Sequence, residues 1–211
     1  MLVEISFVIV LALVVAAIFW VIVRSSSKKI CAQYEKLARQ LNVEMTQPEP
    51  QLGGFIRPEP FLYGSYRERA MSISVPGKGM QNTRQIETVL KLEVSDKSIK
   101  WQMTAKGLLS GMRQRDSGGM EHWTSGDREF DLAIDTRTNE PARLSRLLHE
   151  TRLDAILKAL KESKGSIYLG QGTIVFTRFG LISKDDEREL FKQLTDLLCD
   201  LAEAIEVTRL D

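Results

Sequence analysis

The chain has 211 residues, and its 29 Lys and Arg residues nearly balance its 28 Asp and Glu residues, for a formal net charge of +1. This balance lacks the basic character of nucleic-acid-binding proteins, so we expect no nucleic-acid partner. Cys31 and Cys199 are too few for a disulfide framework, and we expect each to be a small buried side chain in a helix.

The first element is an uncharged run from Ile5 to Val23, apolar except for Ser6. A helix of this length spans roughly 28 Å at about 1.5 Å per residue, which is close to the hydrocarbon thickness of a bilayer. Trp20 lies near its end, where an indole suits the membrane interface. We therefore expect residues 1–23 to be a transmembrane anchor, with the lipid bilayer as the partner of the run.

A buried core helix and a cleaved signal peptide are the alternatives for this run. Core helices seldom run so long without a polar stripe. A signal peptide has a basic start and an apolar core of about 7–15 residues, whereas residues 1–4 contain no Lys or Arg. Arg24, Lys28 and Lys29 follow the run, and basic residues prefer the cytoplasmic side. We expect a single-pass signal anchor in the inner (plasma) membrane, with a cytoplasmic soluble domain.

Residues 24–59 are expected to form a juxtamembrane helix and a linker. Ser25 to Ser27 predict a short polar joint, after which residues 28–43 have a helical period. The stretch from Thr46 to Pro60 contains four prolines and two glycines, which predicts a linker or an extended edge segment.

From residue 60 onward the pattern is typical of a soluble α+β domain that extends to residue 211. Apolar residues alternate with polar ones in residues 71–75, 86–94, 99–105 and 130–135, as expected for strands with one buried face. Residues 95–98 read as a turn, so the second and third of these strands are predicted to form an antiparallel hairpin. Gly107 to Gly126 is an unusually long connection, either a mobile loop or a functional one.

The last third of the chain is predicted to be mainly helical. A helix starts near Pro141, and Thr151 to Asp154 resemble a capping box that starts another. A hairpin follows over residues 167–179 around Gly170-Gln171-Gly172. The final helix begins after Ser183, and its apolar stripe should lie across the sheet as the main core partner: Leu190, Phe191, Leu194, Leu197, Leu198, Leu201 and Ile205. We expect a mostly antiparallel sheet of about five to seven strands packed under helices, with a long C-terminal helix.

Charge is distributed unevenly along the chain. Residues 57–115 hold eleven Lys or Arg against five Asp or Glu, and residues 116–211 hold thirteen against nineteen. The net charges are therefore +6 and −6. Either the two parts attract each other within one fold, or the sheet has a basic face near anionic lipid or an acidic partner.

The sequence assigns no catalytic, cofactor-binding or metal-binding residue, and no cofactor is expected. His122 and His149 are the only histidines, and neither belongs to a cluster with metal-ligand spacing. We interpret His149 as a cation that ends a helix turn. Gly77-Lys78-Gly79 lacks the spacing of a phosphate-binding loop, and Gly107 to Gly111 places its serine wrongly for a nucleophile elbow.

Two stretches resemble a loose class of uncharacterised bacterial single-pass membrane proteins with a soluble α+β domain. They are Pro60-Phe61-Leu62-Tyr63-Gly64-Ser65-Tyr66-Arg67-Glu68-Arg69 and Phe130 to Ile134, the latter followed by Pro141 and Leu144. The closing hairpin and helix are also similar, so the resemblance covers most of the chain. It implies a bacterial inner membrane, no known activity and no functional residues.

Two classes of function remain. The first is a membrane-tethered binding or scaffolding module with a protein partner, which the anchor and the split charge favour. The second is an enzyme, or a protein that binds lipid or another small ligand, with a pocket between the sheet and the C-terminal helix. The absence of catalytic motifs favours a protein that is not an enzyme.

Overall fold

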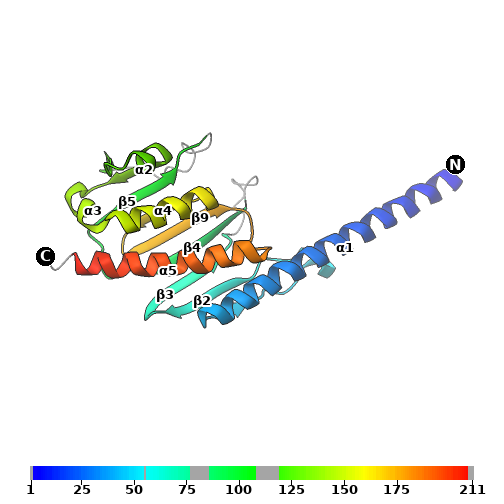
Figure 1. Cartoon of the computed structure of the whole chain (residues 1–211). Coiled ribbons are helices and arrows are strands. Elements are labelled where there is room, and N and C mark those ends of the chain that lie inside the picture. The colour runs from blue at the N-terminus through cyan, green and yellow to red at the C-terminus, as the bar shows by residue number, and fades with distance from the viewer. Residues whose placement is uncertain (1, 55, 77–85, 108–118, 209–211) are drawn as a thin grey trace.

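The structure is a computed structural model, and it describes residues 2–54, 56–76, 86–107 and 119–208. Within these residues an antiparallel sheet of nine strands has the order β1-β2-β3-β4-β9-β8-β5-β7-β6. Helices α4 and α5 and the C-terminal half of α1 lie across one face of it (Figure 1). The strands are β1 (Glu44–Thr46), β2 (Phe61–Tyr66), β3 (Arg69–Ser74), β4 (Glu87–Glu93), β5 (Trp101–Ala105), β6 (Glu121–Trp123), β7 (Ile134–Thr138), β8 (Ser166–Gly170) and β9 (Thr173–Phe179). The helices are α1 (Leu2–Leu41), the short 3-10 helix η1 (Leu52–Gly54), α2 (Arg128–Ala133), α3 (Pro141–Leu147), α4 (Glu150–Ser163) and α5 (Asp185–Val207).

The predicted α+β class is confirmed, with more strands than the five to seven expected. Strands β1 and β6 have three residues each, which is too short to show an alternating pattern. In β2 the apolar residues Phe61, Leu62 and Tyr63 are consecutive and only Leu62 is buried, so the two-residue period is hidden.

One row of directly paired residues shows where the core lies. The row crosses eight strands, and all of its side chains are buried on the helix-covered face: Leu62, Ile73, Leu90, Phe176, Ile167, Met103, Thr136 and Trp123. Because neighbouring residues in a strand point to opposite faces, the adjacent row faces away from the helices.

The predicted hairpin between residues 86–94 and 99–105 is wrong, although both segments are strands. Strand β4 pairs with β3 and β9, while β5 pairs with β8 and β7, so the β8–β9 hairpin lies between them. The chain after β4 passes the β8–β9 turn, where Val94 N donates to Gly172 O at 2.9 Å. A β-carbon at Gly172 would lie only 2.9 Å from the carbonyl oxygen of Val94. Glycine, which has no β-carbon, therefore suits this close approach. Alternation predicts a strand but does not specify its neighbours.

The predicted joint at Ser25 to Ser27 is also wrong, because α1 is continuous from Leu2 to Leu41. Serine costs a helix only a few tenths of a kcal/mol relative to alanine, and the flanking residues are strong helix formers. The helix ends at Asn42, whose φ is +53°, and Val43 N donates to Ala38 O at 3.0 Å. This is the hydrogen bond of a Schellman motif, with asparagine in the left-handed position.

Helix α1 is long and apolar enough to cross a membrane by length and composition, and no residue of its apolar window is buried. Its C-terminal half is different, because Tyr34, Leu37, Ala38 and Leu41 are buried against the domain. The same helix therefore combines a membrane-length segment with a segment of the domain core.

Residues 47–54 and 56–60, which we call the return loop, belong to the stretch predicted to be a linker or edge segment. The strand directly before the return loop, β1, pairs with β2 at the edge of the sheet, and only its last residue, Thr46, belongs to that predicted stretch. The return loop then extends beside α1, where Cys31 Sγ donates to Gln47 Oε1 at 2.8 Å, and Gln47 Nε2 donates to Pro58 O at 3.1 Å. Cys31 is therefore half-buried and hydrogen-bonded rather than buried in the core as expected.

Residues 130–135 are only partly a strand, in contrast to the prediction. Phe130 N donates to Asp127 Oδ1 at 2.8 Å, and this cap starts helix α2 at Arg128. Strand β7 begins only at Ile134. An aspartate at the N-cap satisfies a free backbone donor of the first turn, and this local interaction outweighs the alternating pattern.

The start of α4 differs from the predicted capping box over residues 151–154. His149 is the N-cap residue and Glu150 begins the helix. His149 therefore lies between two helices, directly after Leu148, the C-cap of α3, and at the N-cap of α4.

The long connection from residue 107 to 126 contains strand β6, which pairs with β7. Trp123 is buried and its Nε1 donates to Ser145 Oγ at 3.0 Å, so this end of the connection is anchored to α3. Residues 108–118 lie outside the described residues, and they include most of the Gly107 to Gly111 stretch that we compared with a nucleophile elbow. Gly77-Lys78-Gly79 also lie outside the described residues.

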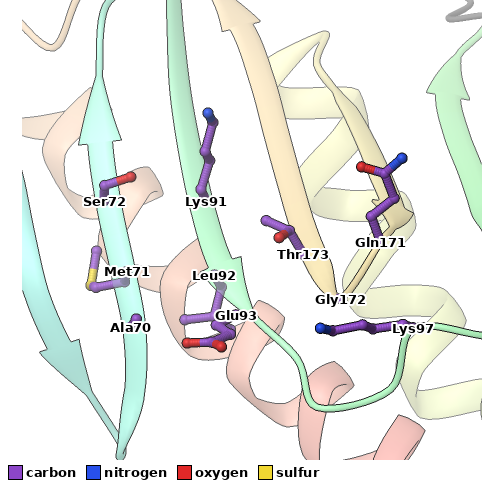
Figure 2. A pocket seen from close by; sticks show the side chains of 10 residues that line it. All are labelled: Ala70, Met71, Ser72, Lys91, Leu92, Glu93, Lys97, Gln171, Gly172 and Thr173. Carbon is purple, nitrogen blue, oxygen red and sulfur yellow. The ribbon is translucent and has the colours of Figure 1, made fainter.

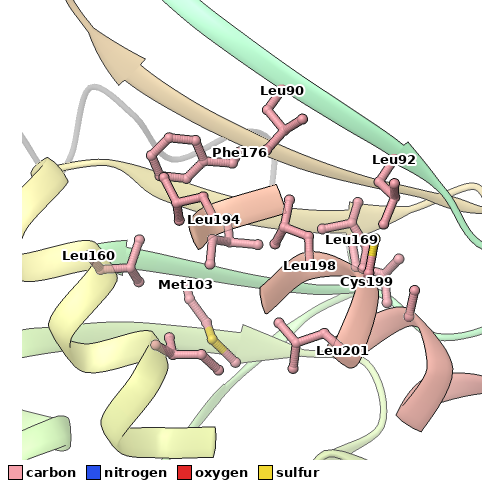
Figure 3. Packing of buried hydrophobic residues seen from close by; sticks show 14 of the residues in the cluster. Leu90, Leu92, Met103, Leu160, Leu169, Phe176, Leu194, Leu198, Cys199 and Leu201 are labelled. Atoms are coloured by element: carbon pink, nitrogen blue, oxygen red, sulfur yellow. The ribbon is translucent and has the colours of Figure 1, made fainter. Parts of the chain in front are cut away.

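Helix α5 crosses the sheet as predicted. Leu194, Leu198 and Leu201 are buried against sheet residues such as Leu90 and Phe176 (Figure 3). The rings of Phe176 and Phe191 meet edge to face, with 5.8 Å between their centroids. Cys199 is fully buried in this cluster, and burial raises the pKa of its thiol to about 11.

Candidate functional site

The candidate functional site is a groove on the outer surface of the helix layer, between α4 and α5. The apolar stripe of α5 is wider than the surface it buries on the sheet. Leu190 and Leu197 are half-buried and point towards α4, and Val207 is 63% exposed. Helix α4 presents the small residues Ala155 and Ala159 opposite them, which leaves a depression between the helices.

Two hollows make up this groove, with volumes of about 610 and 150 Å³. They share Ala155 and Leu197, so they adjoin each other along α5. Leu201 and Ala204 contribute to the floor of the larger hollow, and Leu194 contributes to that of the smaller. The groove is therefore an apolar strip with a charged rim rather than a polar cleft.

The two rims of the larger hollow have opposite charge. On the α4 side lie His149 and Arg152, and Arg152 Nη1 donates to Leu147 O at 2.6 Å, which holds it in place. On the α5 side lie Asp200 and Glu203. An apolar strip between a basic and an acidic rim suits an amphipathic segment with charges along both sides of its apolar face.

A second depression lies on the helix-free face of the sheet, with a volume of about 370 Å³ (Figure 2). Ser72, Lys91 and Thr173 line it on the strands, and Lys97 and Gln171 line it at the adjoining turns. Glu93 lies beside them, so the depression has charges of both signs. Its small polar lining is well solvated in water, whereas the exposed apolar strip of the α4–α5 groove is not, and we therefore regard the groove as the stronger candidate.

The helix-free face is mostly polar, with Val175 as a buried apolar residue in its row. The row of paired residues next to the core row consists of Tyr63, Ser72, Lys91, Val175, Tyr168, Gln102, Arg137 and His122. His122 lies at the far edge with 55% of its side chain exposed, and its Nε2 is 3.4 Å from Asp135 Oδ1. Within the described residues no group of three or more His, Cys, Asp or Glu side chains is placed to hold a metal ion.

The opposite charges of the two parts of the chain meet within the fold. Arg69, at the start of β3, forms two hydrogen bonds of 2.7 Å with Glu206 near the end of α5. Arg67 binds Asp200 at 2.6 Å and Asp196 at 3.3 Å. The hydrogen bonds from Arg69 lower the pKa of Glu206 to about 2. These contacts support the interpretation that the charged halves attract each other, and they leave Arg67 and Arg69 off the helix-free face.

A buried ion pair joins the β4–β5 connection to α3 and α5. The side chains of Asp96 and Arg143 are only 2% and 8% exposed and contact each other directly. Arg143 Nη2 also donates to Ile205 O at 2.9 Å, and Asp96 accepts hydrogen bonds from Ser98 N and Oγ. Burial alone would raise the pKa of Asp96, but the hydrogen bonds from Ser98 and Arg143 outweigh it and lower the pKa to about 2.

Sequence reasoning did not find this groove, because it considered histidines and glycine-rich stretches as candidate sites. Of these, only His149 lines the groove. The available signal was the width of the α5 stripe, since Leu190 and Leu197 extend it beyond one buried face. The alanines of α4 gave no signal alone, because they matter only through the side chains that they face.

The fold and the groove define a class: an α+β domain that follows a membrane-length helix and carries an apolar strip between two surface helices. Neither a protein-family model nor a curated protein matches the sequence. Among solved structures, the fold is similar to that of the mycobacterial trehalose monomycolate transport factor A, TtfA, with a TM-score of 0.51 and 11% identity. The similarity covers 80% of this chain and 94% of that one, and at this identity it shows the fold alone.

Proposed function

We propose that this chain is a membrane-tethered binding module whose α4–α5 groove holds an amphipathic helix of a protein partner. The anchor is the Ile5–Val23 segment of α1, in the inner membrane. The basic residues after it, Arg24, Lys28 and Lys29, favour a cytoplasmic position for the domain. The observation that carries the proposal is the exposed apolar strip of the groove.

The shape and charge of the groove favour a helix as its occupant. Both walls of the groove are helices. A third helix that lies along the groove can pack a ridge of its side chains between α4 and α5, and so bury Leu197 and Val207. The rim charges, Arg152 on one side and Glu203 on the other, would then fix its direction. An apolar floor supplies the binding energy and the rims supply the selectivity.

The alternative function is an enzyme or a carrier with a pocket between the sheet and α5. Large buried side chains from both layers occupy that space in the described residues, among them Phe176, Phe191 and Leu198. A filled core together with an apolar groove outside it favours the binding module over a carrier of this kind.

The partner that we favour belongs to a membrane transport system. The similar structure is described as a transport factor for trehalose monomycolate. A single anchor with a domain whose described core is filled by large apolar side chains suits an accessory protein that acts through contact with another membrane protein. The transported compound is outside this proposal.

The proposal is tested in membranes by placing a photoreactive residue at Val207, which is 63% exposed at one end of the groove. We expect a discrete crosslinked product with one protein. A second substitution, Leu197→Asp, should remove that product because it puts a charge on the apolar floor.

The matched control is Ala142→Asp, the same kind of change at an exposed position of α3 outside the groove. The product should persist in this variant. A product that also disappears with Ala142→Asp, or products with lipid alone, would contradict a protein partner in the groove. Bound lipid seen by native mass spectrometry and lost with Leu197→Asp would mean that the groove holds lipid rather than a partner helix.

A further inference from the structure

The return loop, residues 47–54 and 56–60, reaches back along α1 to the membrane-length part of the helix. Gln47 is hydrogen-bonded to Cys31, and a β-carbon built on Gly54 would lie 3.6 Å from Trp20 Nε1. Cys31 and Trp20 are eleven residues apart, which is about 16 Å along a helix. The return loop therefore follows α1 over this distance, and its short helix η1 is visible as a small cyan coil beside the blue helix in Figure 1.

The pattern of exposed and half-buried residues along α1 is consistent with this contact between the return loop and the helix. On the segment before the domain core most side chains are exposed, but Trp20, Val23, Ser27 and Ile30 are half-buried. They are three or four residues apart and therefore lie on one face of the helix. This covered face continues into the buried residue Tyr34, so the domain covers α1 without interruption down to Trp20.

The tip of the return loop is a tight turn with exposed apolar side chains. Gln51 and Ile56 form a bridge, with backbone hydrogen bonds of 2.8 and 3.2 Å in the two directions. Between them Gly53 and Gly54 have φ of +64° and +92°. Leu52 is 74% exposed and Ile56 is 48% exposed. In water, two exposed apolar side chains at a turn contribute no stabilisation, whereas in the interfacial layer of a bilayer they become buried and favour binding.

The position of this tip relative to a bilayer follows from Trp20. Trp20 lies three residues before the end of the apolar run at Val23, about 4.5 Å inside it along the helix axis. A tip that touches Trp20 is therefore at the level of the membrane interface. Two guanidinium groups lie there too: Arg24 lies 5.0 Å from the centroid of the Trp20 ring, and Arg57 Nε donates to Gly54 O at 3.4 Å.

We propose that the return loop is a second membrane contact, whose tip places Leu52 and Ile56 in the interfacial layer of the bilayer. Arg24 and Arg57 lie where they meet the phosphates of anionic headgroups. This inference rests on the proposed crossing of the bilayer by α1. Its consequence is that the anchor holds the domain in a fixed orientation, because helix and loop together give two points of contact.

The test uses the full-length protein in vesicles of phosphatidylcholine and phosphatidylglycerol. Cys31→Ser removes the accessible thiol, and Cys199 does not react because it is buried and its pKa is raised to about 11. A fluorescent label on Leu52→Cys is then exposed to lipid carrying a spin label near the headgroup, or to iodide in the water. We expect severalfold stronger quenching by the lipid, and weaker quenching by iodide, than for the same label on Arg146→Cys, an exposed site on α3.

A label on Val10→Cys, inside the apolar run, separates the two proposals. If Val10 is quenched by lipid and Leu52 is quenched by iodide as strongly as Arg146, the anchor is right and the return loop does not touch the bilayer. If neither quencher reaches Leu52, another protein covers the tip and the lipid contact is overturned. If Val10 itself is not quenched by lipid, the membrane anchor fails.

Discussion

The Asp96–Arg143 pair is the most consequential polar contact at the scale of single residues. Its two members are distant in sequence, and it joins the β4–β5 connection, α3 and the carbonyl of Ile205 in α5. A charge buried in this way is stabilised only while its partner is present. Loss of either charge therefore affects three elements together.

We predict that Asp96→Asn destabilises the protein by about 3–5 kcal/mol, the usual cost of leaving one charge of a buried pair without its partner. Urea unfolding of the detergent-solubilised protein measures this. The control is Glu129→Gln, because the Glu129–Lys161 pair is exposed, and exposed pairs contribute about 0–1 kcal/mol. Equal effects from both changes would mean that Asp96 is solvated in solution.

We predict that acidic pH lowers the stability of the folded protein through the carboxyl groups of Asp96 and Glu206. Their pKa values are lowered from 3.8 and 4.5 to about 2, so the folded state binds protons less readily than the unfolded chain. Their contribution to stability is complete above the ordinary values and is lost as the pH falls towards about 2. We expect the melting temperature to fall over this range, and Glu206→Gln to make the fall shallower. A pH-independent melting temperature would contradict both lowered values.

The elements show how far the sequence pattern leads. Two-residue alternation predicted β3, β4 and β5, because the apolar residues of each strand lie on the buried, helix-covered face. In β5 the alternating polar residues Gln102 and Thr104 are buried as well. Alternation did not predict the neighbours of these strands, since β9, one of the two partners of β4, begins 80 residues after β4 ends. The groove was equally inaccessible, because it requires Ala155 and Leu197 to meet across two helices. The attraction between the charged halves was predictable as one of two interpretations, and Arg69 and Glu206 carry it.

Helix α5 gives a prediction about packing. Leu198 is fully buried against the sheet, so Leu198→Ala removes apolar contacts and leaves a cavity, at a cost of about 2–5 kcal/mol. Glu203 is exposed on the same helix, and Glu203→Ala should change stability by no more than about 0.5 kcal/mol. Thermal unfolding should show a loss of several degrees for the first variant and almost none for the second. Similar small losses would mean that α5 is not docked on the sheet.

At the scale of the whole molecule, one uninterrupted helix contains the membrane-length segment and continues into the core of the folded domain. With the domain in the cytoplasm, as we propose, a reporter that is active only in the cytosol should work when it is fused after Asp211. The basic residues Arg24, Lys28 and Lys29 set this direction. Activity of a periplasmic reporter at the same position would reverse the orientation, while the anchor itself would remain.

The order of the strands has a consequence for synthesis on the ribosome. Strands β1 to β4 and strands β5 to β7 are made early, but in the finished sheet they are joined only through β8 and β9, residues 166–179. Until those residues emerge, β4 and β5 each present an unpaired edge, and such edges recruit other strands. A nascent chain that stops before Ser166 should therefore aggregate or stay bound to chaperones. Completion of the hairpin turns two incomplete half-sheets into one within a few seconds of translation at about 5–20 residues per second.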